Sequence, residues 1–289
     1  MDKVPDNFGA LPEEFSHWKG SKIVVLPVPY DGEPVWQAGA EKGPSAFIEA
    51  SKNMELWDEY LQQNTAMNVI HTGHAVEGKT TAEVTRKIRD KVTLVAGAKK
   101  FPVIIGGDHS ITPGAVASIK ELYPDVSVLQ LDAHADLWDK YKGSEDSPAC
   151  VMTNIHNMKI PFVQVGIRSL SEDEVGIIKK HRYSVFYAHD IKGNTDWHED
   201  AIKKLNNDVY ITLDLDVFDP SIMPSTGTPE PGGLLWEDVT RFLEKVFKER
   251  NVVGIDITEL CPIKGMHAPD FLAAKLAYRI MGFKFRKDE

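Results

Sequence analysis

Two aspartates and a histidine stand at alternate positions directly after an apolar stretch of the chain. Asp132, His134 and Asp136 follow the run Val126–Leu131, which has the composition of a buried strand. In a strand, alternate side chains point to one face, so three ligands would leave the end of the strand together. Carboxylate and imidazole groups suit Mn²⁺, Fe²⁺, Ni²⁺ or Zn²⁺, and no soft ligand is present to favour copper. The stretch therefore predicts part of a metal site.

Three further segments carry the same chemistry, each at the end of another apolar run. His109 follows a pair of glycines that permits a tight turn, Asp214 and Asp216 close a second run, and Glu259 closes a third. Any one of these motifs alone is more often a turn or a helix cap than a ligand. Without Glu259, the four segments together offer six candidate ligands, four aspartates and two histidines. Six ligands exceed the needs of one ion with an open position, whereas two ions about 3.5–4 Å apart can share bridging carboxylates. Four clustered aspartates would also repel one another unless their pKa values rise or cations neutralise them.

The elements that must position these residues alternate between strand and helix. Apolar, β-branched-rich runs predict eight strands, at Ile23–Tyr30, Met67–Thr72, Pro102–Gly106, Val126–Leu131, Phe162–Ile167, Ser184–Ala188, Val209–Val217 and Val252–Thr258. Helical patterns lie between them, at Pro44–Trp57, Thr81–Lys100, Pro113–Leu122, Glu172–Lys180, Asp196–Leu205, Trp236–Glu249 and Pro269–Phe283. Thr112 before Pro113 predicts an N-cap, and Ser171 with Glu174 predicts a capping box. The alternation predicts an α/β fold, a parallel sheet with helices on both faces, in which ligands bind beyond the carboxyl ends of the strands.

Composition narrows the function classes. The 289 residues, 42% hydrophobic and 26% charged, fit one globular domain, which we expect to span residues 1–289. A net charge of −10 argues against nucleic acid or an anionic membrane as partner and is compatible with a cationic small substrate. Two cysteines, a polar N-terminal stretch and the lack of an apolar run of about 20 residues predict a cytoplasmic protein.

Taken together, the motifs resemble those of the ureohydrolase family of arginases and agmatinases, over nearly the whole chain. The matching segments are Gly-Gly-Asp-His at 106–109, Asp-Ala-His-Ala-Asp at 132–136, Asp-Leu-Asp-Val-Phe-Asp-Pro at 214–220 and Gly-Thr-Pro-Glu-Pro-Gly-Gly at 227–233. The last of these, and Ala-Pro-Asp-Phe-Leu-Ala-Ala-Lys at 268–275, look more like agmatinases than arginases.

The resemblance implies a three-layer α/β/α fold with an eight-stranded parallel sheet and a binuclear Mn²⁺ site. By motif, one ion would be held by His109, Asp132, Asp136 and Asp214, and the other by Asp132, His134, Asp214 and Asp216. Glu259 matches the glutamate that pairs with the substrate guanidinium, and Thr228 lies in a loop near the site. A hydroxide bridging the two ions and oriented by Asp136 would attack the guanidinium carbon, and the tetrahedral intermediate would collapse to urea and an amine. The resemblance also implies a homo-oligomer, a trimer or a hexamer.

The chain departs from the family at one functional position. The family usually carries a histidine, thought to deliver the proton to the leaving amine, where this chain has Pro148. Proline cannot titrate, and general acid catalysis contributes about 10²–10⁴-fold. Three readings follow: a water molecule or another side chain, with His156 and Tyr141 as candidates, relays the proton; the substrate is a different guanidino or amidino compound; or most of the activity has been lost.

The loop that follows Asp-Ala-His-Ala-Asp at 132–136 indicates which substrate is favoured. Between Leu137 and Ser147 it carries Asp139, Glu145 and Asp146 against two lysines, which favours a substrate without a carboxylate, such as agmatine, whose products are urea and putrescine, a polyamine precursor. Guanidinobutyrate, formimidoylglutamate and arginine are the alternatives. A metal-bound but inactive scaffold is an alternative from another class. A metal-dependent deacetylase is less favoured because the chain lacks a His-His pair.

Several other residues could line the site. Trp138 is expected to wall the pocket, His267 could reach its mouth, and Asp139 or Glu145 could attract a distal ammonium. Cys150 is expected to be structural, Trp36 and Trp57 to pack in the core or at its rim, and the remaining histidines singled out to be surface or loop groups in polar surroundings: His71, His74, His181, His189 and His198.

Overall fold

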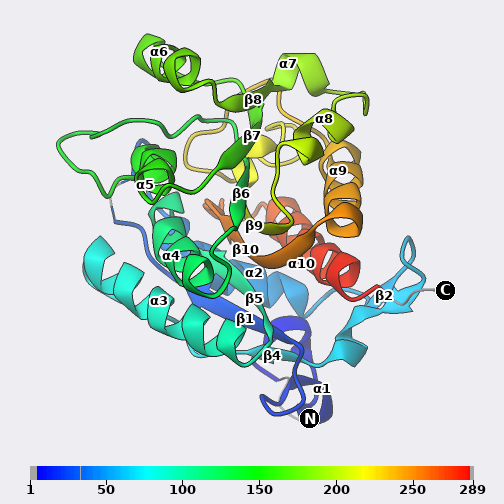
Figure 1. Cartoon of the computed structure of the whole chain (residues 1–289). Helices are drawn as coiled ribbons and strands as arrows, with labels where there is room; N and C mark the ends of the chain where they lie inside the picture. Colours follow the sequence, from blue (N-terminus) through cyan, green and yellow to red (C-terminus); the bar gives the residue numbers. More distant parts are fainter. Residues whose placement is uncertain (1–4, 33, 287–289) are drawn as a thin grey trace.

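An eight-stranded parallel sheet runs through the centre of the protein (Figure 1). The computed structural model describes residues 5–32 and 34–286. Neighbouring strands follow the order β4-β1-β5-β10-β9-β6-β7-β8, and every neighbouring pair is parallel. The strands are β1 (Ile23–Val28), β4 (Ile70–Thr72), β5 (Phe101–Gly106), β6 (Ser127–Leu131), β7 (Phe162–Ile167), β8 (Ser184–Tyr187), β9 (Asp208–Asp214) and β10 (Asn251–Thr258).

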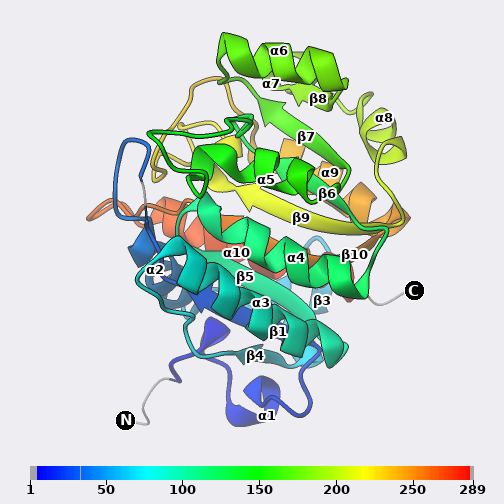
Figure 2. The same ribbon diagram turned by 60° about the vertical axis from the view of Figure 1, so that its left-hand side comes forward.

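Helices cover both faces of this sheet, which confirms the predicted three-layer α/β/α architecture (Figure 2). One core cluster joins the sheet to α2 (Gly43–Ser51), α8 (His198–Lys203), α9 (Trp236–Glu249) and α10 (Ala268–Lys284). The other joins it to α3 (Thr81–Gly97), α4 (Thr112–Leu122), α5 (Val151–Asn157) and α6 (Glu172–His181). Alternate residues of one strand serve opposite clusters: Val103 and Ile105 of β5 pack in the first, and Ile104 in the second.

The four central strands carry the candidate site. β5, β10, β9 and β6 are consecutive in the sheet, although β5 and β6 are consecutive in the chain and the other two strands come much later. β5 and β6 are buried along their whole length, as expected for parallel strands covered on both faces. Their carboxyl ends therefore lie side by side at the point where the strand order reverses, the usual position of a ligand site in such sheets.

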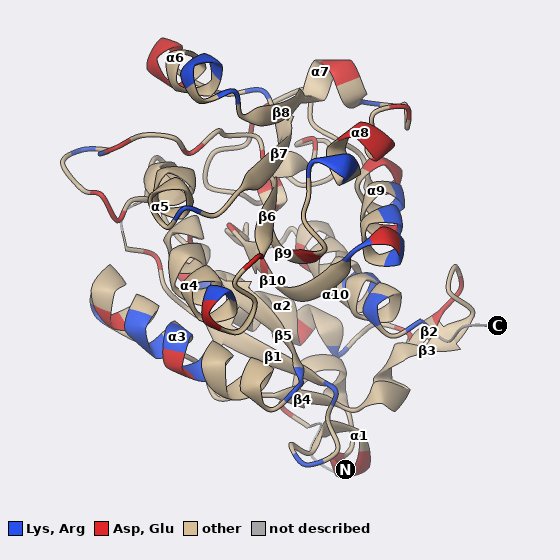
Figure 3. Cartoon of the chain, in the orientation of Figure 1, with Lys and Arg blue, Asp and Glu red and all other residues tan. Residues whose placement is uncertain are grey.

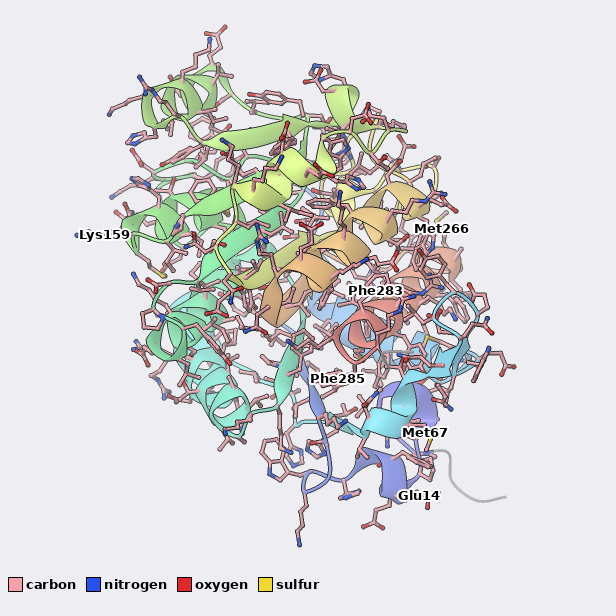
Figure 4. All side chains as sticks on the ribbon, turned by 45° about the vertical axis from the view of Figure 1, so that its right-hand side comes forward. Glu14, Met67, Lys159, Met266, Phe283 and Phe285 are labelled. Carbon is pink, nitrogen blue, oxygen red and sulfur yellow. The ribbon has the colours of Figure 1, made fainter. Side chains whose placement is uncertain are left out.

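Small elements complete the chain. They are α1 (Glu13–Ser16), α7 (Ala188–Ile191) and a two-stranded antiparallel hairpin of β2 (Trp57–Asp58) and β3 (Gln63–Asn64). Phe283 and Phe285 at the end of α10, labelled in Figure 4, pack on Phe247 of α9 and Phe101 of β5. Charged residues lie along the outer helices, while the strands are mostly uncharged (Figure 3). Among the described residues no helix has the length and apolarity to cross a membrane.

Several element boundaries differ from those predicted. The predicted helix Pro44–Trp57 ends at Ser51, and Trp57 pairs with Asn64 in the hairpin. The predicted strand Val209–Val217 ends at Asp214, where a 3₁₀ turn begins, and that predicted from Met67 begins only at Ile70. Apolar runs continue through these turns, so hydrophobicity alone could not mark where the backbone leaves the strand.

Of the two predicted caps, one is confirmed. Ser171 accepts a hydrogen bond from the backbone N–H of Glu174, and the Glu174 side chain accepts one from the N–H of Ser171, a complete capping box. Thr112, however, is the first residue of α4 rather than its cap, because a 3₁₀ turn at His109–Ile111 runs straight into the helix. Its hydroxyl instead lies 3.2 Å from that of Thr212, beneath the site.

Candidate metal centre and active site

The end of β5 is tied to the end of β10 by backbone hydrogen bonds. The N–H of Glu259 donates to the carbonyl of Gly107, and the Glu259 side chain accepts a 2.7 Å bond from the N–H of His109. Glu259 has φ +65°, a left-handed conformation that redirects its side chain after the strand. A Cβ on Gly107 would lie 1.8 Å from the carbonyl of Tyr30, so only glycine allows this close passage.

The carboxylates at positions 132–136 and 214–216 converge for a different reason from the one predicted. β6 ends at Leu131, so Asp132, His134 and Asp136 do not alternate on a strand. The chain turns instead: Asp132 accepts from the N–H of His134, and Asp136 has φ +52°. In the same way, Asp214 ends β9 and accepts from the N–H of Asp216, which lies in a 3₁₀ turn.

All six predicted ligands nevertheless come together. His109 Nδ1 lies 3.2 Å from Asp132 Oδ2, 3.1 Å from Asp136 Oδ2 and 3.5 Å from Asp214 Oδ2. His134 Nδ1 lies 2.8 Å from Asp216 Oδ2 and 3.6 Å from Asp132 Oδ1. Two groups of three residues could each hold an ion, because the candidate ligand atoms within each group all lie within 4.8 Å of one another. The groups are His109 with Asp132 and Asp214, and Asp132 with His134 and Asp216, so Asp132 belongs to both.

The residues present fit a pair of cations. His109 Nδ1 is buried and, in the described part of the chain, has no hydrogen-bond partner, although three carboxylate oxygens surround it. No described Lys or Arg forms an ion pair with Asp132, Asp136, Asp214 or Asp216. Buried carboxylates and an orphaned imidazole nitrogen aimed at common points are what a divalent ion would satisfy.

The pKa values show the electrostatic cost of this cluster in the protein alone. Burial and the neighbouring Asp132 raise the pKa of Asp136 to about 7. Burial, with Asp216 and Asp132, raises that of Asp214 well above its usual range. Burial lowers the pKa of His134, but Asp216 and Asp132 outweigh it and raise the value to about 12. Protons thus provide the missing positive charge here, and cations can replace them.

A chain of buried side chains beneath the site orients His109. Its Nε2 lies 2.7 Å from the hydroxyl of Thr212, which donates to Asp256, and Asp256 also accepts from the hydroxyl of Tyr210. An imidazole fixed through Nε2 presents Nδ1 to the site. Thr212 and Asp256 were not predicted as site residues from the sequence. Both alternate with apolar residues in strands that lead directly to proposed site residues, a signal that could have revealed them.

Two more supporting residues were missed. Gln130 of β6 donates to Asp132 at 2.8 Å and to Asp136 at 3.3 Å, a neutral donor inside the sheet. Arg168, just after β7, donates to the backbone carbonyls of Asp216 and Glu230 at 2.6 and 2.8 Å. Arg168 therefore braces the loop around Asp216 through its backbone and leaves the carboxylate free.

A cavity of about 210 Å³ opens above the two groups. Its wall includes His109, His134, Asp136, Asp214, Asp216, Thr228 and Glu259. Glu174 of α6 and residues from the outer loops also line it: Asp31, Trp36, Trp138, Tyr141 and Ser171. None of the described residues lining it is Lys or Arg. Burial, with Asp108 nearby, raises the pKa of Glu259 well above its usual range, and no described Lys or Arg pairs with it. The cavity is thus suited to a cation.

Pro148 faces this cavity, as the resemblance implies. It is buried and begins a 3₁₀ turn, and its ring forms part of the wall together with Ala149. Of the two suggested relays, Tyr141 lines the cavity, whereas His156 does not: its Nδ1 lies 2.8 Å from the hydroxyl of Tyr183, at a separate surface hollow. The suggestion of His156 was wrong, because it lies near the C-terminal end of α5, which carries it away from the site.

Of the other residues predicted to lie near the site, some line the cavity and others do not. Trp138 and the exposed Trp36 line the cavity, whereas His267 is exposed and lies outside its wall. Neither Asp139 nor Glu145 lines the cavity, and Glu145 pairs with Lys140.

Cys150 is buried in the turn after Pro148, and burial raises its thiol pKa to about 11, in keeping with a structural role. His198 corrects the prediction of polar surroundings. It is 4% exposed and packs against Trp197 and Phe242, and burial lowers its pKa to about 4. Trp57 is 55% exposed rather than in the core, and His71 donates a hydrogen bond from Nδ1 to the backbone carbonyl of Ser16.

Comparison with known proteins agrees with this geometry. Residues 21–282 match the model of the arginase family. The chain is 38% identical to an N(1)-aminopropylagmatine ureohydrolase of Thermus thermophilus over 94% of this chain and 93% of that protein. It is 34% identical to a Synechocystis protein of the same name, over 96% of both chains. The crystal structure of the agmatine ureohydrolase of Thermoplasma volcanium superposes with a TM-score of 0.87 at 27% identity, covering 99% of this chain and 95% of that one. The chain therefore belongs to the arginase family and is a hydrolase of the ureohydrolase class.

Proposed function

We propose that the protein hydrolyses a cationic alkylguanidine without a carboxylate, agmatine or its N-aminopropyl derivative, to urea and a di- or triamine. One observation carries the proposal: the cavity beside the two ligand groups is rich in carboxylates, and no described Lys or Arg lines it. A substrate carboxylate such as that of arginine or guanidinobutyrate would meet no Lys or Arg among the described residues that line the cavity. The names of the curated relatives support the same class of substrate.

The proposed metal centre holds two divalent ions, with Mn²⁺ favoured by the family resemblance. His109, Asp132, Asp136 and Asp214 would hold one ion, and Asp132, His134, Asp214 and Asp216 the other. Such a pair supplies a strong nucleophile from water at neutral pH. Gln130 keeps the carboxylates of Asp132 and Asp136 in place, and Thr212 keeps the His109 ring in its orientation.

Glu259 would recognise the guanidinium. Its Oε1 is held by the N–H of His109, and its carboxylate has no described cationic partner. A planar guanidinium supplies the opposite charge and parallel donors that such a buried carboxylate lacks. Binding of the guanidinium would allow Glu259 to ionise. The substrate cation would thereby offset the cost of a buried, unpaired carboxylate. Thr228, in the segment 227–233, also lines the cavity and would contact the substrate there.

The leaving amine must gain a proton, and Pro148 cannot provide it. The reaction consumes one water molecule. Its oxygen adds to the guanidinium carbon and becomes the urea oxygen, the bond from that carbon to the alkylated nitrogen breaks, and both protons of the water end on that nitrogen, which leaves as an ammonium. In this chain the proton would come from water at the wall beside Pro148 or from the hydroxyl of Tyr141, which lines the same cavity.

The test is urea release after loading with Mn²⁺, measured over agmatine, N-aminopropylagmatine, arginine and guanidinobutyrate. We expect turnover of the first two and at least about tenfold lower kcat/KM for the two carboxylates, since an unpaired charge in the cavity is costly. Preference for a carboxylate substrate would refute the substrate proposal. No urea from any compound, despite two tightly bound ions, would instead favour an inactive metal-bound scaffold.

A further inference from the structure

Two loops form the mouth of the cavity. Pro34, Val35 and Trp36 come from the segment after β1, and Trp138 and Tyr141 come from the loop after the second motif. Trp36 is 67% exposed, and the rings of Trp138 and Tyr141 meet edge to face at 5.9 Å. The mouth is therefore largely aromatic, while the base of the cavity is acidic.

A tight turn projects a lysine from the second loop. Tyr141 and Ser144 exchange two 2.9 Å backbone hydrogen bonds, which leaves Lys142 and Gly143 as the two residues of the turn. Their φ values are +49° and +90°. Glycine and asparagine adopt positive φ readily at such positions, whereas lysine pays a steric penalty. The backbone thus places a long cationic side chain at a position where the turn itself would favour a small residue.

The Lys142 ammonium lies between the two loops. Its Nζ is 3.2 Å from the carbonyl oxygen of Val35 and 5.4 Å from the centroid of the Tyr141 ring. No ion pair joins it to any carboxylate of the described residues, although Lys140, two residues earlier, pairs with Glu145. A carbonyl oxygen and an aromatic face are neutral groups that bind a primary ammonium without neutralising its charge.

We propose that this carbonyl-and-ring site is the subsite for the terminal ammonium of the extended substrate, and that Lys142 is its exchangeable internal occupant. The proposal rests on the proposed function, because it assigns the outer end of the same substrate. With no substrate bound, Lys142 bridges the two loops at Val35 and Tyr141. An alkylguanidine that ends in an ammonium replaces one primary ammonium by another at Val35 and Tyr141, so the charge at the site is conserved. A guanidine with an apolar tail has nothing to exchange.

Replacement of the lysine tests the exchange. Lys142→Asn removes the ammonium, and asparagine tolerates the left-handed backbone of the turn. Without the competitor, KM for N-aminopropylagmatine should fall roughly two- to fivefold, the range expected for an exposed cation–π contact. The KM for butylguanidine and kcat for both should stay unchanged. Lys140→Asn is the matched control, since it removes the same charge from the same loop away from Val35 and should change neither KM.

Binding of the product spermidine, measured by calorimetry on the Mn²⁺-loaded protein, provides a readout that does not need turnover. Lys142→Asn should tighten binding by the same factor, and Tyr141→Leu added to it should abolish the gain, whereas Tyr141→Phe should keep it. An equal rise in KM for both substrates would show that Lys142 only holds the loops together, and unchanged spermidine binding would also overturn the proposal. Lack of urea release by the unaltered protein would contradict the proposed function but leave the spermidine measurement valid as a test of the subsite.

Discussion

Two buried groups of charged residues in this protein balance their charge in opposite ways. Where the β2–β3 hairpin meets α10, Arg279 donates to Asp58 at 2.5 Å, and the two side chains are 7% and 1% exposed. Asp58 also accepts from the N–H groups of Tyr60 and Leu61. At the ends of the central strands, by contrast, buried carboxylates gather around two histidines, and no described Lys or Arg pairs with them.

The difference separates a structural cluster from a functional one. Asp58 has its cation within the chain, so its burial serves to fasten the hairpin to α10. The strand-end carboxylates lack one, so the protein alone must hold protons there, with the pKa of Asp136 raised to about 7 by burial and Asp132. A site that is electrostatically incomplete by itself is completed by cations or by a cationic substrate.

The largest expected effect comes from removing a carboxylate that we propose bridges the two ions. Asp214→Asn should lower kcat by about 10³-fold or more, because the stabilisation supplied by a metal pair amounts to several kcal/mol. Metal content measured by mass spectrometry should fall below two ions per chain. In chelated protein at pH 7.5 the same variant should raise Tm, because a carboxyl whose folded pKa is raised destabilises the protein above its unfolded pKa. A lowered Tm would contradict the view that this cluster is incomplete.

The Asp58–Arg279 pair should behave in the opposite way. Arg279→Met leaves a buried carboxylate without its partner, so the free energy of unfolding should fall by about 3–5 kcal/mol, while kcat per folded molecule is kept. Urea unfolding followed by circular dichroism measures the first, and urea release the second. Arg286→Met, which breaks the exposed pair with Glu244, is the control and should cost about 0–1 kcal/mol. If both variants had equal effects, burial would not be what distinguishes Asp58.

Replacement of Pro148 tests whether the site also lacks a group that protonates the leaving amine. If proton delivery limits turnover, Pro148→His should raise kcat on the true substrate by up to about 10²-fold, because a positioned acid typically contributes that much. Pro148→Ala controls for loss of the ring and should not accelerate the reaction. An unchanged kcat for the histidine variant would mean that water or Tyr141 already supplies the proton fast enough.

His198 provides a third case, a buried imidazole that forms no ion pair with any carboxylate of the described residues. Burial lowers its pKa to about 4, so it stays neutral in the fold, whereas the unfolded chain binds a proton below about 6.5. The unfolded state therefore takes up more protons between these values, and stability should be lost as pH falls from about 6.5 to 4.

Replacing His198 should reduce that loss. The difference in unfolding free energy between pH 7.5 and pH 5 should shrink by about 1–2 kcal/mol in His198→Gln, which cannot titrate. The exposed His189→Gln is the control and should leave the pH dependence unchanged. A dependence that persists in His198→Gln would assign the loss of stability to the strand-end carboxylates and histidines instead.

Much of the site could be read from the chain because each motif follows an apolar run. Strands of a parallel sheet end at one edge, so residues placed after Ile105, Leu131 and Leu213 had to approach one another. The helix boundaries and the turns were harder to predict. Asp136 at φ +52° and Glu259 at φ +65° adopt conformations that composition does not reveal, and the predicted strand alternation at 132–136 was wrong although its members do meet.

The sequence by itself determined the chain order of the eight sheet strands, the six residues that cluster at their ends and the departure at Pro148, because these depend on periodicity and on residue types at fixed spacing. It did not reveal α5, which lies between β6 and β7. Only the tertiary structure decided which distant groups support them. Thr212 and Asp256 reach His109, Arg168 holds the Asp216 loop, and Lys142 crosses to Val35. These contacts join residues far apart in the chain, so they depend on the packing of whole elements, which local patterns do not encode.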